Sequence, residues 1–401
     1  MKVLLSAYAC APDEGSEPEV GFQALLAAAR RHHVWVFTQP HMAERLHRFL
    51  DGHPAAAQIQ LEGIDPPDPV QRDGLWQLAQ TQWRYDQWQR RVAARALELD
   101  RRIGFDVVHH ITLAAYWMRT GVAAVSKPLV WGPVGGGVEP PRRLVGELGL
   151  NGLVESGVRI GVRRILGTLL SSQVARSAAV VFVQNEATAR RMPRRVDAVV
   201  LTNGICVKVE AMPPSGVRRP DIAFVGRLAP WKGGRLAIRA LRYVSAPHAL
   251  LRIYGEGPER QRILEAARRW GLEDRVHLEG RLPRRELVAR VARAGVLLHP
   301  SLHEESPIAV AEALTMGTPL VCLDHGGPAE LIRQWPGSPS VAVAPGRPDA
   351  TARALAHAVD RFLADPPPVP PVPAAPKDSF GDRILEAYER AVVLGSRLSA
   401  S

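Results

Sequence analysis

The sequence predicts an α/β protein with two doubly wound parallel sheets, and its length, composition and periodicity support this class. The chain has 401 residues, enough for two or three domains of about 150 residues each. Apolar residues make up 46% and charged residues 23%, an ordinary globular composition that excludes global disorder. Short β-rich runs alternate with helix-period segments at the spacing of βαβ units, which favours parallel sheets with helices on both faces.

The alternation is clearest in the second half of the chain. Strands are expected there at 221–225, 250–254, 276–278, 296–299 and 319–323. The helices that follow them are expected at 234–244, up to Trp270, from Arg284, at 307–316 and at 328–333. Each strand is short and apolar and each is followed by a helical period, so one parallel sheet is predicted.

The first half follows the same order less regularly, and it predicts a second Rossmann-like domain. Its strands are expected at 3–7, 34–38, 107–110, 129–131 and 180–184. The turn-rich AMPPSGVRRP (211–220) separates the two domains, and the proline-rich 365–376 is expected to be an extended linker. A last helix is expected at 379–394 and is free to dock on either domain. The expected limits are 1–212 and 213–376 for the two domains and 377–401 for the C-terminal helical segment. We expect this last segment to pack on the first domain.

Charge and cysteine content narrow the class of protein. The net charge of +11 comes almost wholly from arginine, and because arginine is spread evenly we expect no nucleic-acid partner. The three cysteines, Cys10, Cys206 and Cys322, are far apart and form neither a disulfide framework nor a CxxC metal site. No apolar run reaches the roughly 18 residues of a membrane span. A cytoplasmic protein is expected, with peripheral contact at the inner face of the membrane as an alternative.

The stretch FVGRLAPWKGG (224–234) is the first candidate for a binding site. It places Arg227 just after a strand and Lys232 just before a helix. Two cations at the carboxyl end of a strand, beside a helix N-terminus, suit a diphosphate. Two solvated loop residues are the alternative interpretation.

The second candidate is PSLHEESPIAVAEALTMG (300–317). Ser306 is expected to cap a helix that starts at Pro307, which leaves Glu304 in the preceding loop and Glu312 in the second turn. Eight helical residues span about 12 Å, so the two carboxylates are separated on the scale of a nucleotide sugar. Because the helix is apolar nearly all round, Glu312 needs a partner.

These motifs together resemble a known family. VGRLAPWKGG, GEGPER, PSLHEESPIAVAEAL and GTPLVCLDHGGPAELI follow one another from about Ile222 to Ile332. In this order they resemble the retaining GT-B glycosyltransferases of family four, a bacterial group 1 glycosyltransferase family. Weaker matches in the first half are ACAPDEGSEPEVGF, FDVVHHIT, VWGPVGGG and LTNGI. The resemblance implies two Rossmann-like domains with a cleft between them and a nucleotide sugar as donor.

Roles on the donor side follow from the resemblance by position. Arg227 and Lys232 match the basic pair on the donor diphosphate. Glu304 matches the first acid of an E-x7-E motif, which holds the transferred sugar, and Glu312 matches the second, which holds the ribose hydroxyls. The donor side of the predicted site comprises Gly15, Arg227, Lys232, Glu304, Ser306, Ile308 and Glu312.

The first domain supplies the remaining candidates. Gly15 lies in the first βα turn, where a glycine lets backbone N–H groups approach a phosphate, although a plain turn glycine is the alternative. Asn203 matches the family's interdomain Asn-Gly pair, and Glu17 joins it on the acceptor side. His109 and His110 close a strand, and in the family a histidine of this region contacts the donor sugar or acceptor. Side chains alternate along a strand, so one of the two faces the cleft. His110 is favoured because Thr112 shares its face, and packed histidines remain the alternative.

The sequence also departs from the family pattern. Glu305 stands where glycine is common and Ser306 where an aromatic residue is common, which leaves the sugar specificity open because a further carboxylate lies beside the sugar position. Glu305 could equally point to solvent. Cys206 replaces an aspartate that often follows the Asn-Gly pair.

The resemblance implies a retaining transfer, for which the sequence offers no nearby carboxylate nucleophile. A front-face route is therefore expected, in which the leaving diphosphate helps to deprotonate the incoming hydroxyl while Arg227 and Lys232 stabilise the developing charge. We expect neither metal nor cofactor, because no DxD-type pair follows a strand and the two cations act on the diphosphate. Catalytic roles are assigned to His110, His109, Glu304, Arg227 and Lys232.

The acceptor and the reaction class stay open. Trp76, Trp83 and Trp88 on an expected helix, and basic residues Arg159, Arg163 and Arg164 on an amphipathic one, could contact a membrane or a lipid-linked acceptor, but core packing is the better-supported reading. Besides a transferase acting on a hydroxyl of a glycoconjugate, a polysaccharide or a secondary metabolite, two alternatives remain. One is a sugar-nucleotide epimerase on the same scaffold, and the other is a non-catalytic subunit that binds the nucleotide sugar.

Overall fold

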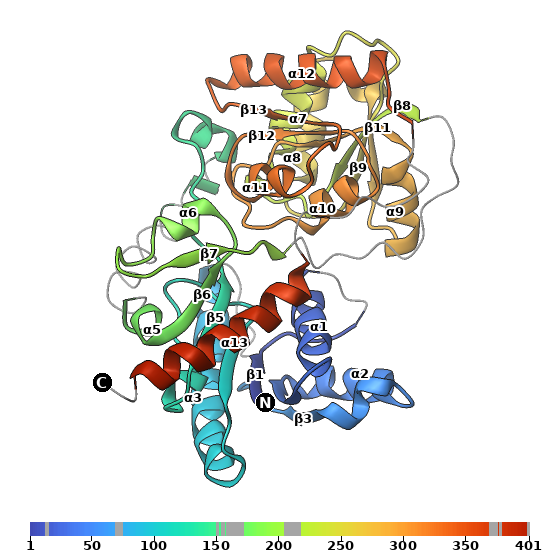
Figure 1. Cartoon of the computed structure of the whole chain (residues 1–401). Coiled ribbons are helices and arrows are strands. Elements are labelled where there is room, and N and C mark those ends of the chain that lie inside the picture. The colour runs from blue at the N-terminus through green and yellow to red at the C-terminus, as the bar shows by residue number, and fades with distance from the viewer. Residues whose placement is uncertain are drawn as a thin grey trace. The chain divides into compact units, whose positions relative to one another are not determined.

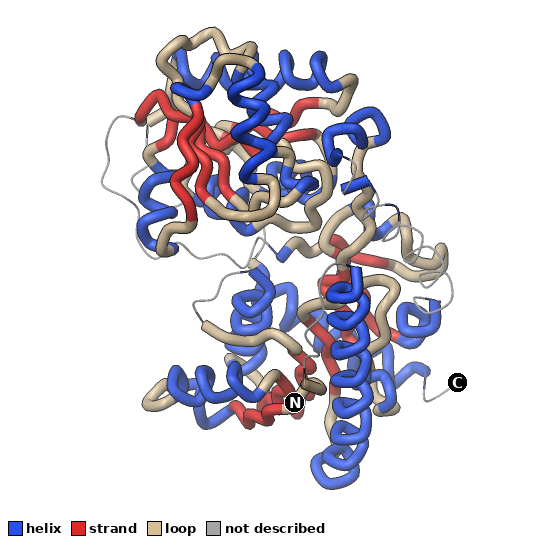
Figure 2. Tube along the Cα trace, turned by 180° about the vertical axis from the view of Figure 1, so that it is seen from behind, coloured by secondary structure: helices blue, strands red, loops and turns tan. Residues whose placement is uncertain are grey.

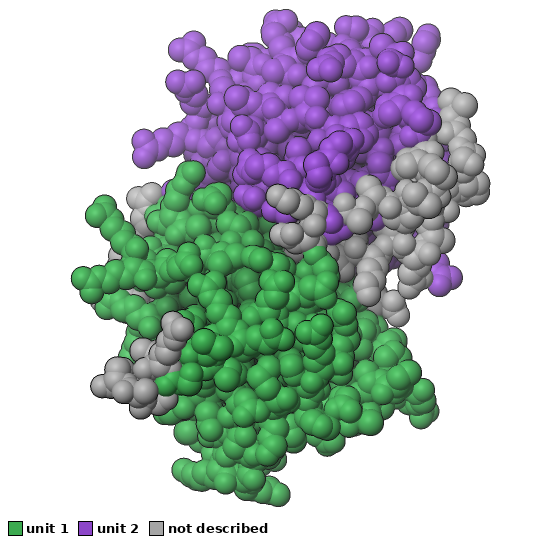
Figure 3. All heavy atoms as spheres, viewed as in Figure 1, with its two compact units in different colours: residues 1–137, 159–206, 378–401 green, residues 138–158, 207–377 purple. Residues whose placement is uncertain are grey.

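The computed structural model describes residues 1–12, 16–68, 75–149, 152–153, 157, 172–203, 218–368, 376 and 379–398. Its chain divides into two compact units (Figure 3), each assembled from separate stretches. Unit 1 comprises 1–137, 159–206 and 378–401, and unit 2 comprises 138–158 and 207–377. The main difference between these limits and the expected domains is that residues 138–158 group with the second unit.

The described residues of unit 1 form a seven-stranded parallel sheet in the order β3-β2-β1-β4-β5-β6-β7. Its strands are β1 (Lys2–Ala7), β2 (His33–Thr38), β3 (Ile59–Gly63), β4 (Val107–Ile111), β5 (Leu129–Val134), β6 (Ala178–Val183) and β7 (Ala198–Val200). The strand order reverses between β1 and β4. In sheets of this kind, ligands bind at such a reversal, beyond the carboxyl ends of the strands.

Helices cover both faces of this sheet (Figures 1 and 2). The described helices and 3-10 turns are α1 (Ser16–Ala29), α2 (Pro40–Leu50), η1 (Pro54–Gln58), α3 (Leu75–Ile103), η2 (Gly121–Ala124), α5 (Ser172–Ser177), α6 (Glu186–Ala189) and α13 (Phe380–Leu398). The C-terminal helix α13 packs beside α1 and against β4, β5 and β6, so unit 1 holds both the first strand and the last helix of the chain.

Unit 2 repeats the architecture in its described part with a six-stranded parallel sheet in the order β10-β9-β8-β11-β12-β13. Its strands are β8 (Arg219–Val225), β9 (Leu251–Tyr254), β10 (Val276–Gly280), β11 (Ala294–His299), β12 (Leu320–Leu323) and β13 (Ser340–Val343). Here the order reverses between β8 and β11. The loops after these two strands therefore leave the same edge of the sheet side by side.

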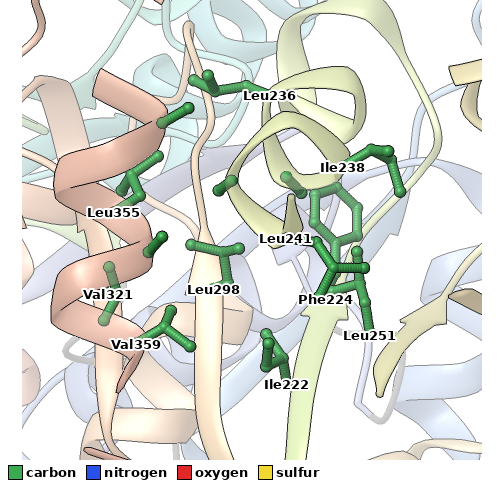
Figure 4. Packing of buried hydrophobic residues seen from close by; sticks show 14 of the residues in the cluster. Ile222, Phe224, Leu236, Ile238, Leu241, Leu251, Leu298, Val321, Leu355 and Val359 are labelled. Carbon is green, nitrogen blue, oxygen red and sulfur yellow. The ribbon is translucent and has the colours of Figure 1, made fainter. Parts of the chain in front are cut away.

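The helices of unit 2 bury an apolar core against this sheet. They are η3 (Arg142–Leu148), η6 (Pro230–Lys232), α7 (Gly234–Leu241), α8 (Arg260–Arg269), η7 (Glu273–Arg275), α9 (Arg284–Ala292), α10 (Ile308–Thr315), α11 (Gly326–Gln334) and α12 (Pro348–Ala364). Figure 4 shows Leu236, Ile238 and Leu241 of α7 and Leu355 and Val359 of α12 packed over the central strands. All five side chains are buried.

The expected strands are present, and so are the expected helices that fall within the described residues. Three strands were not anticipated, at 59–63, 198–200 and 340–343, and each lies at an edge of its sheet. Their residues are largely half-buried, so the continuous apolar run that marks a central strand is missing. One helix start was also wrong: Pro307 is the N-cap and α10 begins at Ile308, so Ser306 does not cap it.

The stretch after β5 explains why 138–158 groups with unit 2. Leu144 and Leu148 of η3 are fully buried in the core of that unit. Between them in sequence, Glu147 is 5% exposed and pairs with Arg239 of α7 at 3.0 Å. The apolar packing and the shielded ion pair fix this segment to unit 2, although it directly continues a strand of unit 1.

Candidate functional site

The candidate site of unit 2 lies at the carboxyl ends of β8 and β11, where the strand order reverses. The loop after β8 carries Arg227 and Lys232, and the loop after β11 carries Glu304. Because β8 and β11 are hydrogen-bonded neighbours, both loops emerge together. The structure thus brings Lys232 and Glu304 into contact across 72 positions of sequence.

Lys232 and Glu304 form an ion pair. Lys232 Nζ donates to Glu304 Oε2 at 2.5 Å, and the two side chains are 19% and 17% exposed. Burial opposes ionisation of Glu304 most strongly, but the charge and the hydrogen bond of Lys232, together with the neighbouring His299 and His303, outweigh burial, so the pKa of Glu304 lies below its usual value. Glu304 is therefore a carboxylate at neutral pH. Lys232 was expected to bind the donor diphosphate and Glu304 the donor sugar, whereas in the structure they bind each other.

Arg227 differs from Lys232 in its environment. Its side chain is exposed, and within the described part of the chain no ion pair or side-chain hydrogen bond engages its guanidinium. It stands five positions before Lys232 on the same loop. Two cations therefore follow the carboxyl end of β8. Among the described residues Arg227 has no side-chain partner, whereas Lys232 is paired with Glu304.

His299 ends β11 next to this pair. Its side chain is 3% exposed, and its Nε2 lies 3.9 Å from Glu304 Oε2. Burial lowers the pKa of His299 to about 4, although the neighbouring Glu304 acts in the opposite direction. The imidazole is consequently neutral, and its Nε2 has no hydrogen-bond partner among the described residues. His299 was not among the expected site residues; its only signal in the sequence is a polar residue at the end of an apolar strand.

Glu312 has a separate basic partner. It lies on α10 and is 9% exposed, and Arg284 at the start of α9 pairs with its Oε1 at 2.9 Å. Burial raises the pKa of Glu312, and Arg284 offsets part of that rise. The expectation that this acid needs a partner on its apolar helix is confirmed, whereas the identity of Arg284 was missed because it lies on another helix.

Glu305 is engaged by the backbone. Its Oε1 accepts a hydrogen bond from the Val138 N–H at 3.1 Å, and nearby His325 Nε2 donates to the Glu139 carbonyl at 2.8 Å. The loop is held from the other side by Gly327, whose N–H donates to the Glu304 carbonyl at 2.9 Å. A Cβ at Gly327 would lie 2.1 Å from the Glu305 carbonyl oxygen, so only glycine fits. The side chains of Ser306 and Ile308 are half-buried on the same stretch.

Both candidate histidines of unit 1 are buried and hydrogen-bonded. His109 bonds through Nδ1 to the Tyr388 hydroxyl at 2.8 Å and through Nε2 to the Gly132 carbonyl at 2.9 Å. His110 bonds to Ser6 Oγ at 3.1 Å and to the Tyr85 hydroxyl at 2.8 Å. Burial lowers the pKa of His109 to about 4, and burial together with His109 lowers that of His110 to about 3. The rings face opposite sides of the sheet, and both are neutral and packed.

The acceptor-side candidates Glu17 and Asn203 come together in unit 1. Glu17 Oε1 accepts from Asn203 Nδ2 at 3.3 Å, and its Oε2 accepts from the Leu113 N–H at 2.7 Å. Burial raises the pKa of Glu17, and the Leu113 hydrogen bond offsets part of the rise. Thr112 and Leu113 have φ of 62° and 49°, a left-handed turn directly after β4. Such strain is costly for β-branched and bulky residues and is concentrated at functional sites.

Several sequence predictions fall outside the described residues. Gly15, Gly204, Cys206 and the segment 158–171 with its arginines are among them, as is the side chain of Trp76. Of the other two tryptophans of α3, Trp88 is fully buried and donates to the Ile64 carbonyl at 2.9 Å, which is core packing. Trp83 is 51% exposed.

In the part of the chain that the structure describes, no helix is both long and apolar enough to cross a membrane. No group of three or more histidine, cysteine, aspartate or glutamate side chains there could hold a metal ion.

With this geometry in view, the chain can be compared with known proteins. Residues 211–369 match the family model of glycosyl transferases group 1. This group 1 region lies within unit 2 and includes Arg227, Lys232, Glu304 and Glu312. It covers less than half of the chain.

The chain is 32% identical over 204 residues to a 2-deoxystreptamine glucosyltransferase of Streptomyces kanamyceticus, covering 50% of each protein. It spans half or less of the length of the first curated relatives it matches.

Its structure resembles Anabaena HepE in complex with UDP and glucose, with 17% identity, a TM-score of 0.53 and coverage of 100% of this chain and 98% of the other. It also resembles sucrose-phosphate synthase of Thermosynechococcus elongatus, with 18% identity, a TM-score of 0.57 and coverage of 100% and 97%. The fold class is confirmed as GT-B, with two Rossmann-like domains.

Proposed function

We propose that this protein is a hexosyltransferase that moves a sugar from a nucleotide sugar to a hydroxyl acceptor. The observation that carries the proposal is the Lys232–Glu304 pair beside the exposed Arg227, inside the group 1 region. The pair places a cation for the diphosphate and a carboxylate for the sugar at one strand edge. Carboxylates bind sugar hydroxyls well because each oxygen accepts a charge-assisted hydrogen bond.

The donor is proposed to be a UDP-sugar. Anabaena HepE, which has the same fold, has been crystallised with UDP and glucose. In this chain Arg227 and Lys232 would hold the diphosphate, Glu304 the hexose and Glu312 the ribose. Ser306 and Ile308 would line the same pocket, and Gly15 would approach the phosphates from the other domain. The pKa of Glu312 is raised by burial, and Arg284 favours the ionised form that accepts hydroxyl hydrogen bonds.

The transfer is proposed to retain anomeric configuration by a front-face route. The bond between the sugar anomeric carbon and the leaving phosphate oxygen breaks, and a bond to the acceptor oxygen forms on the same face. The acceptor proton passes to the leaving diphosphate. Arg227 and Lys232 stabilise the charge that develops there, so neither metal nor cofactor is required. His110 is proposed to position the reacting groups as a neutral imidazole, and His109, whose ring faces the other side of the sheet, to hold the strand that carries it.

The acceptor is proposed to be a polyhydroxylated molecule of a bacterial glycoconjugate, polysaccharide or secondary metabolite. One relative is named 2-deoxystreptamine glucosyltransferase, and another is named glycogen synthase. Glu17 and Asn203 would bind the acceptor through their joined polar groups. We propose a cytoplasmic location, with contact at the inner membrane face as an option that the exposed Trp83 leaves open.

The proposal is tested by incubating the purified protein with UDP-, GDP- and ADP-sugars and identifying the products. We expect slow hydrolysis of one nucleotide sugar with release of the nucleoside diphosphate. Lys232→Ala and Glu304→Ala should each lower the rate by about 100- to 1000-fold, the usual cost of removing one group that stabilises developing charge.

Glu265→Ala is the matched control, because Glu265 is an exposed acid elsewhere in unit 2. It should leave the rate unchanged. Interconversion of UDP-sugars without release of UDP would instead indicate an epimerase. Binding without any turnover in the presence of candidate acceptors would indicate a non-catalytic subunit.

A further inference from the structure

Three hydrogen-bond donors surround one oxygen of Glu304. Lys232 Nζ lies 2.5 Å from Oε2, Ser301 Oγ lies 3.3 Å from it and His299 Nε2 lies 3.9 Å from it. Only Lys232 is at full ion-pair distance. The hydroxyl of Ser301 is shared, because Oγ also lies 3.0 Å from the Trp231 carbonyl oxygen and has a single hydrogen.

The proposed function requires this arrangement to change. Lys232 cannot neutralise a diphosphate fully while it remains bound to Glu304. If Lys232 leaves, Glu304 loses the partner that keeps its pKa low in a largely buried position. An uncompensated buried carboxylate is costly and would rotate or take up a proton. Another donor must therefore hold Glu304 when the diphosphate is bound.

His299 meets the requirements for that donor. It is 3% exposed and its position is fixed at the end of β11, where its backbone pairs with Cys322 of β12. Its Nε2 is a buried polar atom without a hydrogen-bond partner in the described part of the chain. Such orphaned atoms are rare in native proteins and need an explanation. A shift of about 1 Å would bring Nε2 and Glu304 Oε2 to hydrogen-bond distance.

We propose that His299 is a positioning residue that takes over Glu304 Oε2 when Lys232 transfers to the donor diphosphate. The inference rests on the proposed function and adds a partner exchange to it. While Lys232 pairs with Glu304, its ammonium holds Oε2. Once Lys232 has moved to the diphosphate, His299 and Ser301 hold Oε2, and Oε1 accepts from a hexose hydroxyl. The sugar-binding carboxylate thus stays ionised and in place after Lys232 has left it.

Binding measurements with His299→Leu and His299→Gln separate this role from a packing role. The probes are UDP and the UDP-sugar that the wild-type protein hydrolyses, each titrated calorimetrically. His299→Leu should bind both UDP and the UDP-sugar roughly 10- to 100-fold more weakly, because each draws Lys232 away from Glu304 and the variant lacks the replacement hydrogen bond to this charged group. His299→Gln retains an N–H donor and should recover most of that loss.

Two controls accompany the titrations. His248→Leu changes an exposed histidine of unit 2 and should leave both affinities unchanged. Thermal unfolding of each variant shows whether it is folded. Undiminished binding of UDP and the UDP-sugar by His299→Leu, or no rescue by glutamine, would overturn the inference and leave the proposed function standing. A wild-type protein that binds none of UDP-, GDP- and ADP-glucose would overturn both.

A crystal structure of the wild-type protein with UDP gives a second readout that does not depend on variants that may misfold. We expect Lys232 Nζ on the diphosphate and His299 Nε2 within about 3.2 Å of Glu304 Oε2. If UDP is bound while Lys232 stays on Glu304, or if His299 remains beyond hydrogen-bond distance after Lys232 has moved, the partner exchange does not occur.

Discussion

Glu304 and Glu312 show how two acids of one motif acquire different properties. Each is mostly buried and each has a basic partner, Lys232 and Arg284 respectively. The pKa of Glu304 is lowered because Lys232 and the neighbouring histidines together outweigh burial, whereas the pKa of Glu312 is raised because burial exceeds the effect of Arg284. The spacing of the two acids is visible in the sequence, but the partners and hence the direction of each shift are not.

Arg284→Ala should make folding stability depend more strongly on pH. Without Arg284 the pKa of Glu312 rises further above its unfolded value. A carboxyl with a raised folded pKa favours folding when protonated, so its stabilising effect is present at acid pH and is lost as the pH rises through the folded pKa. The melting temperature of the variant should therefore fall further below wild type at pH 7.5 than at pH 5.

Arg290→Ala is the matched control for this prediction. Arg290 lies on the same helix and pairs with Glu286 at 2.9 Å, but both side chains are exposed. Exposed pairs contribute about 0–1 kcal/mol, so its effect should be small at both pH values. A loss of stability in Arg284→Ala that is equal at the two pH values would show that the charge of Glu312 is not controlled by Arg284.

At the scale of elements, the loop 301–307 is shaped by segments distant in sequence. Val138 donates to Glu305 from one side, and Gly327 at the start of α11 donates to the loop backbone from the other. Because Glu305 directly follows the first acid of the motif, its carboxylate was expected either beside the sugar position or in solvent. In the structure one of its oxygens instead fixes the segment that enters unit 2 after β5.

Glu305→Ala should loosen this entering segment, whereas Glu305→Gln should not, because the glutamine carbonyl oxygen can still accept from Val138. Limited proteolysis should detect faster cleavage near 138–143 in the alanine variant only. The preference of both variants among UDP-sugars should match wild type. A changed sugar preference in Glu305→Gln would show that this side chain contacts the donor.

At the scale of the whole molecule, unit 1 is completed by the end of the chain. The helix α13 buries Ile384, Leu385 and Tyr388, and Tyr388 is hydrogen-bonded to His109 of β4. The exposed ion pair between Arg30 and Asp382 adds little to this contact. Burial of apolar side chains and a buried hydrogen bond therefore hold the last helix, despite the proline-rich stretch that precedes it.

Leu385→Ala should destabilise unit 1 by about 2–5 kcal/mol, the usual cost of removing a buried leucine side chain. Leu385 is 2% exposed, whereas Val393 of the same helix is 53% exposed. Val393→Ala should therefore change stability by no more than about 0.5 kcal/mol. Hydrogen exchange followed by mass spectrometry should show faster exchange in Leu385→Ala peptides from β4 to β6 and unchanged exchange in peptides from β8 to β12.

If hydrogen exchange in Leu385→Ala were instead accelerated only in peptides of unit 2, α13 would not belong to the core of unit 1.

Sequence patterns predicted the central strands and one edge strand, β10, and missed the other three edge strands. Val3 to Ala7 and Val296 to His299 are continuous buried runs, and such runs are recognisable because both faces of a central parallel strand are covered. The edge strands β3, β7 and β13 lack that coverage and were missed. Similarly, Lys232 and Glu304 could be selected by motif, while His299 and Arg284 could not, because neither occupies a position that local periodicity marks.

The sequence by itself determined the α/β class, the central strands and the residues of the basic pair and of the acidic motif. Tertiary structure decided which cation pairs with which acid, and that Glu305 accepts a hydrogen bond from the backbone of Val138. It also decided that 138–158 and 378–401 each belong to a different unit from the residues that precede them in sequence. The physical reason is that periodicity reports only local burial along one element. Ion pairs and orphaned polar atoms arise where elements separated by many residues converge, so their effects on charge and pKa are set by the packed fold.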